Sequence, residues 1–170
     1  ESLPEQHLHA ATVACGNTQL AGPWGEGRAY EWSDAIEAAQ VVARACGVDL
    51  EVEAADYLPW HPGRCAAVKV AGTDVVLGHA GELHPQVLEA LNLPARTCAM
   101  ELDVTAMPLE EKFPAPVLSS FPALHQDIAL VVDEDVPAER VRATVEEGAG
   151  ELIESVELFD IFRGEQLGEG

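Results

Sequence analysis

The sequence predicts an α+β fold, with an antiparallel sheet and inserted helices followed by a smaller β-α-β unit. Three observations lead to this prediction. Short apolar and β-branched runs are joined by tight turns, as in antiparallel sheets. Two longer segments combine helical periodicity with capping residues. Between these two parts lies a proline-rich stretch without periodicity, residues 106–117.

The first element is a strand at residues 7–15, where successive positions alternate and β-branched residues close the run. Residues 16–32 follow as a loop, because four glycines and a proline interrupt them. The best helix is 34–46, which Asp34 can cap, with Glu37 completing a capping-box pattern. Small residues dominate its inward face, so we expect the helix to lie close against the sheet.

Strands and one short helix follow in quick succession. The strands are expected at residues 50–55, 65–71, 74–80 and 97–104. The AGTD sequence between the second and third of them predicts a tight hairpin turn. The short helix, 84–93, has Pro85 at its first position, and His84 before it can act as the cap.

The proline-rich stretch marks a boundary between two domains. We place the first domain at residues 1–110, the linker at 111–117 and the second domain at 118–170.

The second domain is predicted to be a β-α-β unit, which is half of a ferredoxin-like fold. Its strands are residues 127–133 and 151–162, and its helix has Pro137 in the first turn and glycines at the end. The sequence begins at Glu1 and ends before a second half of that fold. We therefore expect a fragment of a longer protein with one open sheet edge.

Composition excludes several classes of protein. Apolar residues make up 48% of the chain and charged residues 23%, and no apolar run is long enough to cross a membrane. The net charge of −21 argues against non-specific binding to nucleic acid, because phosphates would be repelled. The four cysteines lie among apolar residues without a C-x-x-C spacing, so we expect buried, reduced thiols in a cytoplasmic protein.

Histidines gather in PWHPGRCAAV and GHAGELHP, between residues 59 and 85. One interpretation is a zinc hydrolase that uses His61, Cys65, His79 and His84. Against it, proline and glycine lie inside the first spacing and a turn inside the second, and no H-E-x-x-H pattern occurs. We therefore expect turn-forming and capping roles for the histidines, with His79 ending a strand, and no metal site.

Motifs for catalysis are absent as well. The chain has no nucleophile elbow, no P-loop and no dinucleotide-binding glycine motif after a strand. Taken alone, the residues predict a soluble α+β binding or structural module. An alternative is a stand-alone ferredoxin-like regulatory module that binds a small molecule, which would require a complete second β-α-β.

Five segments carry a family resemblance. They are PWHPGRCAAV, GHAGELHPQVLEALNLP, CAMELDV, SSFPALHQDIALVVDEDVP and ELIESVELFDIFRGEQLGEG. In this order and with this spacing, they resemble the C-terminal part of the bacterial phenylalanine–tRNA ligase β subunit. The resemblance covers the whole chain and is strongest over 59–104 and 118–170.

The resemblance implies a division of labour. Residues 1–110 would be the later part of a synthetase-like domain with the class II fold, which performs no chemistry and packs against the catalytic α subunit in an (αβ)2 heterotetramer. Residues 118–170 would begin a ferredoxin-fold anticodon-binding domain that docks on tRNA-Phe. The whole cytoplasmic enzyme would use ATP and Mg²⁺, with no cofactor bound by this fragment.

The resemblance also suggests site residues, none of them catalytic. Those expected to face RNA are Ser119, Ser120, Phe121 and Arg163. Those expected at the subunit interface, or to order loops near it, are His61, Arg64, Glu82 and His84.

One departure from the family weakens the expected contact with tRNA. The family commonly has two arginines before Asp127, where this chain has His125 and Gln126. Residues 118–170 hold three basic and 13 acidic side chains, a net charge of −10. We therefore expect this fragment alone to bind tRNA poorly.

Overall fold

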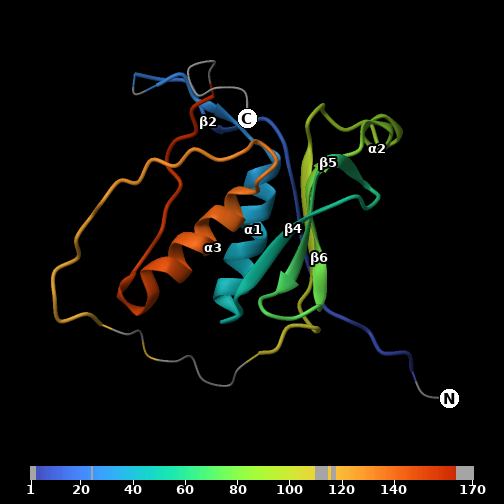
Figure 1. Cartoon of the computed structure of the whole chain (residues 1–170). Helices are drawn as coiled ribbons and strands as arrows, with labels where there is room; N and C mark the ends of the chain where they lie inside the picture. The colour runs from blue at the N-terminus through green and yellow to red at the C-terminus, as the bar shows by residue number, and fades with distance from the viewer. Residues whose placement is uncertain (1–2, 24, 110–114, 116–117, 164–170) are drawn as a thin grey trace. The chain divides into compact units, whose positions relative to one another are not determined.

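An antiparallel sheet of five strands is the framework of the first part of the chain (Figure 1). The computed structural model describes residues 3–23, 25–109, 115 and 118–163, and the chain divides into a unit Glu1–Pro114 and a unit Ala115–Gly170. In sheet order the strands are β1 (His9–Ala14), β7 (Cys98–Asp103), β6 (Val76–Leu83), β5 (Trp60–Val70) and β4 (Leu50–Ala55). All neighbouring strands are antiparallel, so the predicted α+β class is confirmed.

The helix α1 (Trp32–Ala45) lies against one face of this sheet (Figure 1). It is capped by Glu31 and not, as predicted, by Asp34. The Asp34 carboxylate accepts the backbone N–H of Glu31 at 2.7 Å and completes a capping box. At the other end, Gly47 has a left-handed φ of 70° and terminates the helix. Neither α1 nor any other helix in the described ranges is long and apolar enough to cross a membrane.

The main core lies between α1 and the sheet. The helix contributes Ala35, Ala39 and Ala43, which are at most 1% exposed. The sheet contributes Val68, Ala80, Cys98, Met100 and Leu102. Small side chains on the helix allow the close approach to the sheet that the sequence predicts. Burial of each large apolar side chain of the sheet stabilises the fold by about 2 kcal/mol.

A smaller core covers one end of the opposite sheet face. The helix α2 (Pro85–Ala90) places Leu88 there, where it packs with Trp60, Cys65, Leu83 and Ala99. The predicted helix 84–93 therefore exists but is shorter at both ends. It starts at Pro85, as expected for a residue whose missing N–H costs nothing in the first turn.

Strands β5 and β6 are longer than the sequence predicts. The predicted strands 65–71 and 74–80 leave out residues 60–64 and 81–83, which contain proline and glycine turn signals. In the structure these residues continue both strands through a bulge, because the sheet supplies backbone partners on either side of it.

A two-stranded ribbon stands where the sequence predicts only a loop, at residues 16–32. It consists of β2 (Asn17–Gln19) and β3 (Arg28–Ala29), paired antiparallel. A Cβ at Gly27 would lie 2.6 Å from the Gln19 carbonyl oxygen, so the returning chain can approach this closely only with glycine. The glycines that make the ribbon possible also hide it from a propensity-based prediction.

An exposed ion pair ties the segment just before the edge strand β1 to β7, and its pH dependence can be tested. His7 Nδ1 lies 2.5 Å from Asp103 Oδ2, which raises the pKa of His7 above 6.5 and lowers the pKa of Asp103 below 3.8. The pair therefore contributes its full stabilisation between the ordinary pKa of Asp103, 3.8, and that of His7, 6.5. This contribution falls as the pH rises through the raised pKa of His7. Thermal unfolding at increasing pH is expected to show this small loss in wild type and not in His7→Gln. Equal pH dependence in both proteins would contradict the assignment.

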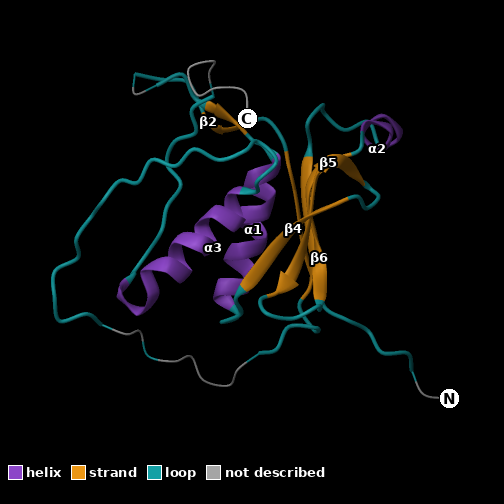
Figure 2. Cartoon of the chain, viewed as in Figure 1, coloured by secondary structure: helices purple, strands orange, loops and turns teal. Residues whose placement is uncertain are grey.

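The second unit contains the helix α3 (Ala138–Ala149), followed by a single 3-10 turn, η1 (Gly150–Leu152). The predicted strands 127–133 and 151–162 are wrong, because neither segment contains a strand. The second begins within η1, and the remaining residues are drawn as loop in Figure 2. A split β-α-β leaves room between its two strands for a third. The described residues supply no such partner strand, so these segments form no strand pairing.

Candidate functional site

A four-residue bulge in β5 is the most irregular feature of the sheet. The pairing of β5 with β6 skips residues 61–64, which all lie opposite one residue of β6, Glu82. Gly63 permits this path with a left-handed φ of 81°. Bulges of this kind re-aim side chains and often lie next to functional sites.

Glu82 faces this bulge and is a buried carboxylate, 5% exposed. Nη1 of Arg64, the last residue of the bulge, donates to its two oxygens at 3.0 and 2.9 Å. Arg96 approaches the same carboxylate, with Nε 3.9 Å from Oε2. Because an unpaired buried charge is strongly unfavourable, Glu82 requires a positive partner. The two bonds from Arg64 supply it and tie the end of the bulge to β6.

Ion pairs continue from Glu82 to the beginning of α1. Arg96 Nη2 lies 3.7 Å from Oε1 of the cap residue Glu31. Arg28 of β3 donates to the Asp34 carboxylate at 2.8 and 2.6 Å, and this bonding lowers the pKa of Asp34 below 3.8. Three half-exposed arginines therefore lie around the N-terminal end of α1. We call Arg28, Arg64 and Arg96 the arginine cluster.

The two histidines of this region have different roles. His84 caps α2, since its Nδ1 accepts the backbone N–H of Gln86 at 3.2 Å, and the predicted capping role is confirmed. The ring centre of His61 lies 6.4 Å from that of His84. Nδ1 of His61 is buried without a hydrogen-bond partner in the part of the chain that the structure describes. A buried nitrogen without a hydrogen bond is energetically unfavourable, so a polar partner at His61, the first residue of the bulge, would be stabilising.

His79 does not end its strand, as the sequence predicts, but lies within β6. Its ring stacks on Tyr57, with centres 4.0 Å apart and planes 4° from parallel. Trp60 lies 5.5 Å away and donates its Nε1–H to the Ala99 carbonyl at 3.0 Å. Burial lowers the pKa of His79, so the imidazole is neutral near pH 7 and packs as an aromatic ring.

The structure does not bring the four candidate zinc ligands together. His61 lies near His84, whereas His79 is stacked on Tyr57 and the Cys65 thiol is buried in the smaller core. Within the described ranges, no group of three or more His, Cys, Asp or Glu side chains is arranged to hold a metal ion. The geometry therefore gives the zinc-hydrolase alternative no support.

The buried thiols are poor nucleophiles. Desolvation raises the pKa of Cys65, and it raises the pKa of Cys98 to about 11 with help from the nearby Glu82 charge. Since only the thiolate reacts, both groups are inert near pH 7. The expectation of burial is wrong for Cys15, which is exposed, and only partly met by Cys46.

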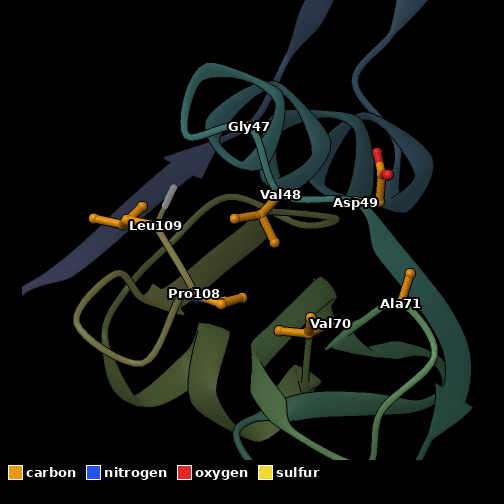
Figure 3. Close-up of a pocket in the computed structure, with 7 residues that line it drawn as sticks. All are labelled: Gly47, Val48, Asp49, Val70, Ala71, Pro108 and Leu109. Carbon is orange, nitrogen blue, oxygen red and sulfur yellow. The ribbon is translucent and has the colours of Figure 1, made fainter. Parts of the chain in front are cut away.

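A hollow of about 400 Å³ lies at the C-terminal end of α1, the end opposite the arginine cluster (Figure 3). It is lined by Gly47, Val48, Asp49, Val70, Ala71, Pro108 and Leu109. Val48, Val70 and Pro108 point toward the hollow, and the Asp49 carboxylate points away from it (Figure 3). Asp49 is the one charged residue among those that line the hollow, so the hollow offers few groups for chemistry. No sequence pattern marks it, because it forms where three separate segments meet.

The residues expected to face RNA lie in the second unit. Ser119 forms a local turn, in which the backbone N–H of Phe121 donates to Ser119 Oγ at 3.2 Å. Ser120 is exposed, and Phe121 is 80% exposed. Arg163 is also exposed and pairs with Glu134 at 3.3 Å. No hydrogen bond or ion pair among the residues that can be described joins Arg163 to the Ser119 turn.

Sequence reasoning missed two members of the arginine cluster, Arg28 and Arg96. Arg28 lies in the unpredicted ribbon, and Arg96 lies in a loop, with an uncommon left-handed φ of 60°. Their carboxylate partners come from α1 and β6, so only the fold brings these groups together. No local spacing in the sequence could have revealed them.

Comparisons with known proteins match both units. The family model described as phenylalanyl tRNA synthetase beta chain CLM domain matches residues 1–104, and the ferredoxin-fold anticodon binding domain matches residues 119–170. Three relatives are named phenylalanine–tRNA ligase beta subunit. The one from Corynebacterium efficiens is 71% identical over 170 residues, which is 100% of this chain and 20% of the relative. Those from Mycobacterium leprae and Streptomyces avermitilis are each 53% identical over 99% of this chain, and over 20% and 21% of their own lengths.

The α+β architecture and these matches place the chain in the class of aminoacyl-tRNA synthetase chains. Within that class, the chain belongs to the phenylalanyl-tRNA synthetase beta chain family. It spans about a fifth of the length of the curated relatives it matches. Neither a stand-alone regulatory module nor a zinc hydrolase is favoured by this membership.

Proposed function

We propose that the chain is a non-catalytic part of the beta subunit of phenylalanine–tRNA ligase. In this role it supports assembly with the catalytic alpha subunit and docks tRNA-Phe for the ATP-dependent attachment of phenylalanine. One observation carries the proposal: the two matching family models follow each other along the chain, and each falls within its own structural unit. A synthetase domain and an anticodon-binding domain are the two components that this role requires.

The domain limits and the finer fold belong to the same proposal. Residues 1–110 form a class II synthetase-like sheet, 111–117 a linker and 118–170 part of a ferredoxin-like anticodon-binding domain. The five-stranded antiparallel sheet with a helix on one face supports the first assignment. In the second unit, the unpaired segments beside α3 carry exposed apolar side chains that further strands would cover.

The whole protein is proposed to be a cytoplasmic (αβ)2 heterotetramer that uses ATP and Mg²⁺, with neither bound by this chain. Docking without catalysis is supported by the thiols and the buried carboxylate of the first unit, which are protonated or already paired. Burial holds the Cys65 and Cys98 thiols protonated. The Glu82 carboxylate, which could otherwise attract a cation, is already neutralised by Arg64.

The sequence-predicted site residues take two roles in this proposal. His61, Arg64, Glu82 and His84 shape the bulge and the start of α2 for the alpha subunit. On the second unit, Ser119 and Ser120 lie next to Phe121, whose exposed ring can stack on a base. Arg163 offers a guanidinium to a phosphate.

Reconstitution tests the division of labour. Full-length beta subunit mixed with alpha subunit is expected to attach radiolabelled phenylalanine to tRNA-Phe, whereas this chain with ATP and Mg²⁺ is expected to give only background. Beta subunit that lacks residues 118–163 should still co-elute with alpha in size-exclusion chromatography and bind tRNA-Phe more weakly. Charging by the isolated chain, or no loss of tRNA affinity on deletion, would overturn the proposal.

A further inference from the structure

Two members of the arginine cluster share one buried carboxylate and keep unused hydrogen-bond donors. Arg64 engages Glu82 through Nη1 alone. Arg96 lies 3.9 Å from Glu82 and 3.7 Å from Glu31, beyond hydrogen-bond distance from both. Since a guanidinium has five N–H donors, most donors of both arginines have no acceptor among the residues described here.

Burial separates the carboxylate from the surface that the two arginines present. The Glu82 side chain is 7% exposed, against 45% for Arg64 and 54% for Arg96. Glu82 therefore holds the Arg64 guanidinium by hydrogen bonds and attracts that of Arg96 from 3.9 Å, in both cases from the inside of the fold. The backbone adds to this positioning, because Arg64 ends the bulge and Arg96 has a left-handed φ of 60°. Arg64 is thus fixed by hydrogen bonds and Arg96 is drawn to the same carboxylate, and both guanidinium groups keep a solvent-facing side.

The chemistry of this surface matches an oxyanion. Arg64 and Arg96 bring two positive charges to one buried carboxylate, and the second carboxylate near Arg96, Glu31, is 45% exposed and lies 3.7 Å away without a hydrogen bond. A planar guanidinium fork binds carboxylate or phosphate with two parallel hydrogen bonds. The remaining basic side chains of the described first unit, Arg28, Arg44 and Lys69, are each hydrogen-bonded to a carboxylate.

The charge of the first part of the chain selects between the two ligand classes, carboxylate and phosphate. In the function proposed above, tRNA docks on the second unit, whereas residues 1–117 hold six basic and 17 acidic side chains, a net charge of −11. A nucleic acid that approaches Arg64 and Arg96 therefore meets long-range repulsion. A single acidic side chain on a protein surface meets little of this repulsion. We propose that Arg64 and Arg96 form a docking point for an aspartate or glutamate side chain of the alpha subunit. This inference rests on the function proposed above and adds the chemistry of the contact.

The test uses the full-length beta subunit and measures its Kd for the alpha subunit by mass photometry of a dilution series. The main variant is Arg64→Gln/Arg96→Gln/Glu82→Gln, which removes both guanidinium groups together with the buried charge that they neutralise. Arg44→Gln is the matched control, since Arg44 is 59% exposed, is paired with Glu37 and lies in the last turn of α1. At about 0.05 M salt the triple variant is expected to bind alpha about tenfold more weakly, and at about 0.5 M the difference should shrink. Arg44→Gln should bind as wild type does.

A second variant keeps the test decisive if the triple variant does not fold, as judged by circular dichroism of free beta. Arg64→Lys/Arg96→Lys retains the charge and loses the planar fork, so its Kd should also rise, by a smaller factor. Folded variants that bind alpha with wild-type affinity at both salt concentrations would overturn the inference. So would a triple variant that assembles normally but loses tRNA-Phe, because the ligand would then be a phosphate. If wild-type beta and Arg44→Gln both fail to bind alpha, the proposed function itself fails.

Discussion

Gly81→Ala is expected to destabilise the chain by about 3 kcal/mol. A Cβ at Gly81 would lie 2.1 Å from the Arg64 carbonyl oxygen, and the φ of +155° is one that residues with side chains rarely adopt. The opposing atom belongs to the backbone, so no side-chain rotation relieves the clash. Strands β5 and β6 must then separate beside the bulge. Urea unfolding of the purified chain measures the loss.

Gly72→Ala is the matched control for this prediction. Gly72 also has a positive φ, +71°, but a Cβ there would meet nothing within 4 Å. Its replacement is expected to cost only about 1 kcal/mol, from the backbone conformation alone. Gly78→Ala should resemble Gly81→Ala, since its Cβ would lie 1.9 Å from the Glu101 carbonyl oxygen. If the Gly81 and Gly72 variants unfold at the same urea concentration, the close approach of the strands is not what stabilises this region.

The clash explains part of the motif GELHP, whose five residues have separate structural tasks. Gly81 permits the close approach to the bulge, and Glu82 anchors its arginine. Leu83 fills the smaller core, His84 caps α2 and Pro85 starts it. On composition alone this region resembles a metal site, because histidine, cysteine and glutamate are common ligands. The structure uses the same side chains for packing, capping and ion pairing.

Local signals account for the elements that the sequence predicts correctly. The helix α1 has its acidic first turn and terminal glycine within one short segment, and His84 caps the helix that starts at the next residue. The bulge at 61–64 was missed because proline and glycine usually end a strand. Only the neighbouring strand, which resumes pairing beyond them, shows that β5 continues.

Non-local contacts explain what the sequence could not predict. The segments 127–133 and 151–162 have the apolar content of strands, yet a strand exists only when another chain segment completes its hydrogen bonds. The candidate site depends on distant contacts in the same way. Arg64, Glu82 and Arg96 come from a bulge, a strand and a loop, and the sheet register brings them together. Of these three, the family resemblance pointed to Arg64 and Glu82 but not to Arg96.

Arg64→Met is expected to destabilise the chain by about 2 kcal/mol, because it leaves the Glu82 carboxylate buried with only a distant arginine. Arg96 stays 3.9 Å away and cannot replace the two bonds that Nη1 of Arg64 donates. The half-exposed position of Arg64 keeps this figure below that of a fully buried pair. Urea unfolding of the wild type, both single variants and the double variant Arg64→Met/Glu82→Gln provides the measurement as a double-mutant cycle.

The double variant is expected to recover most of the stability that Arg64→Met loses, because no buried charge is left without a partner. Arg44→Met is the control, since its pair with Glu37 is exposed on both sides and should contribute less than about 0.5 kcal/mol. Equal unfolding of the single and double variants would mean that the Glu82 charge is stabilised by something other than Arg64. Recovery in the double variant would instead show that Arg64 neutralises Glu82 from its place in the bulge. The bulge could then be kept folded without its arginine, and its role in docking could be measured separately from its role in stability.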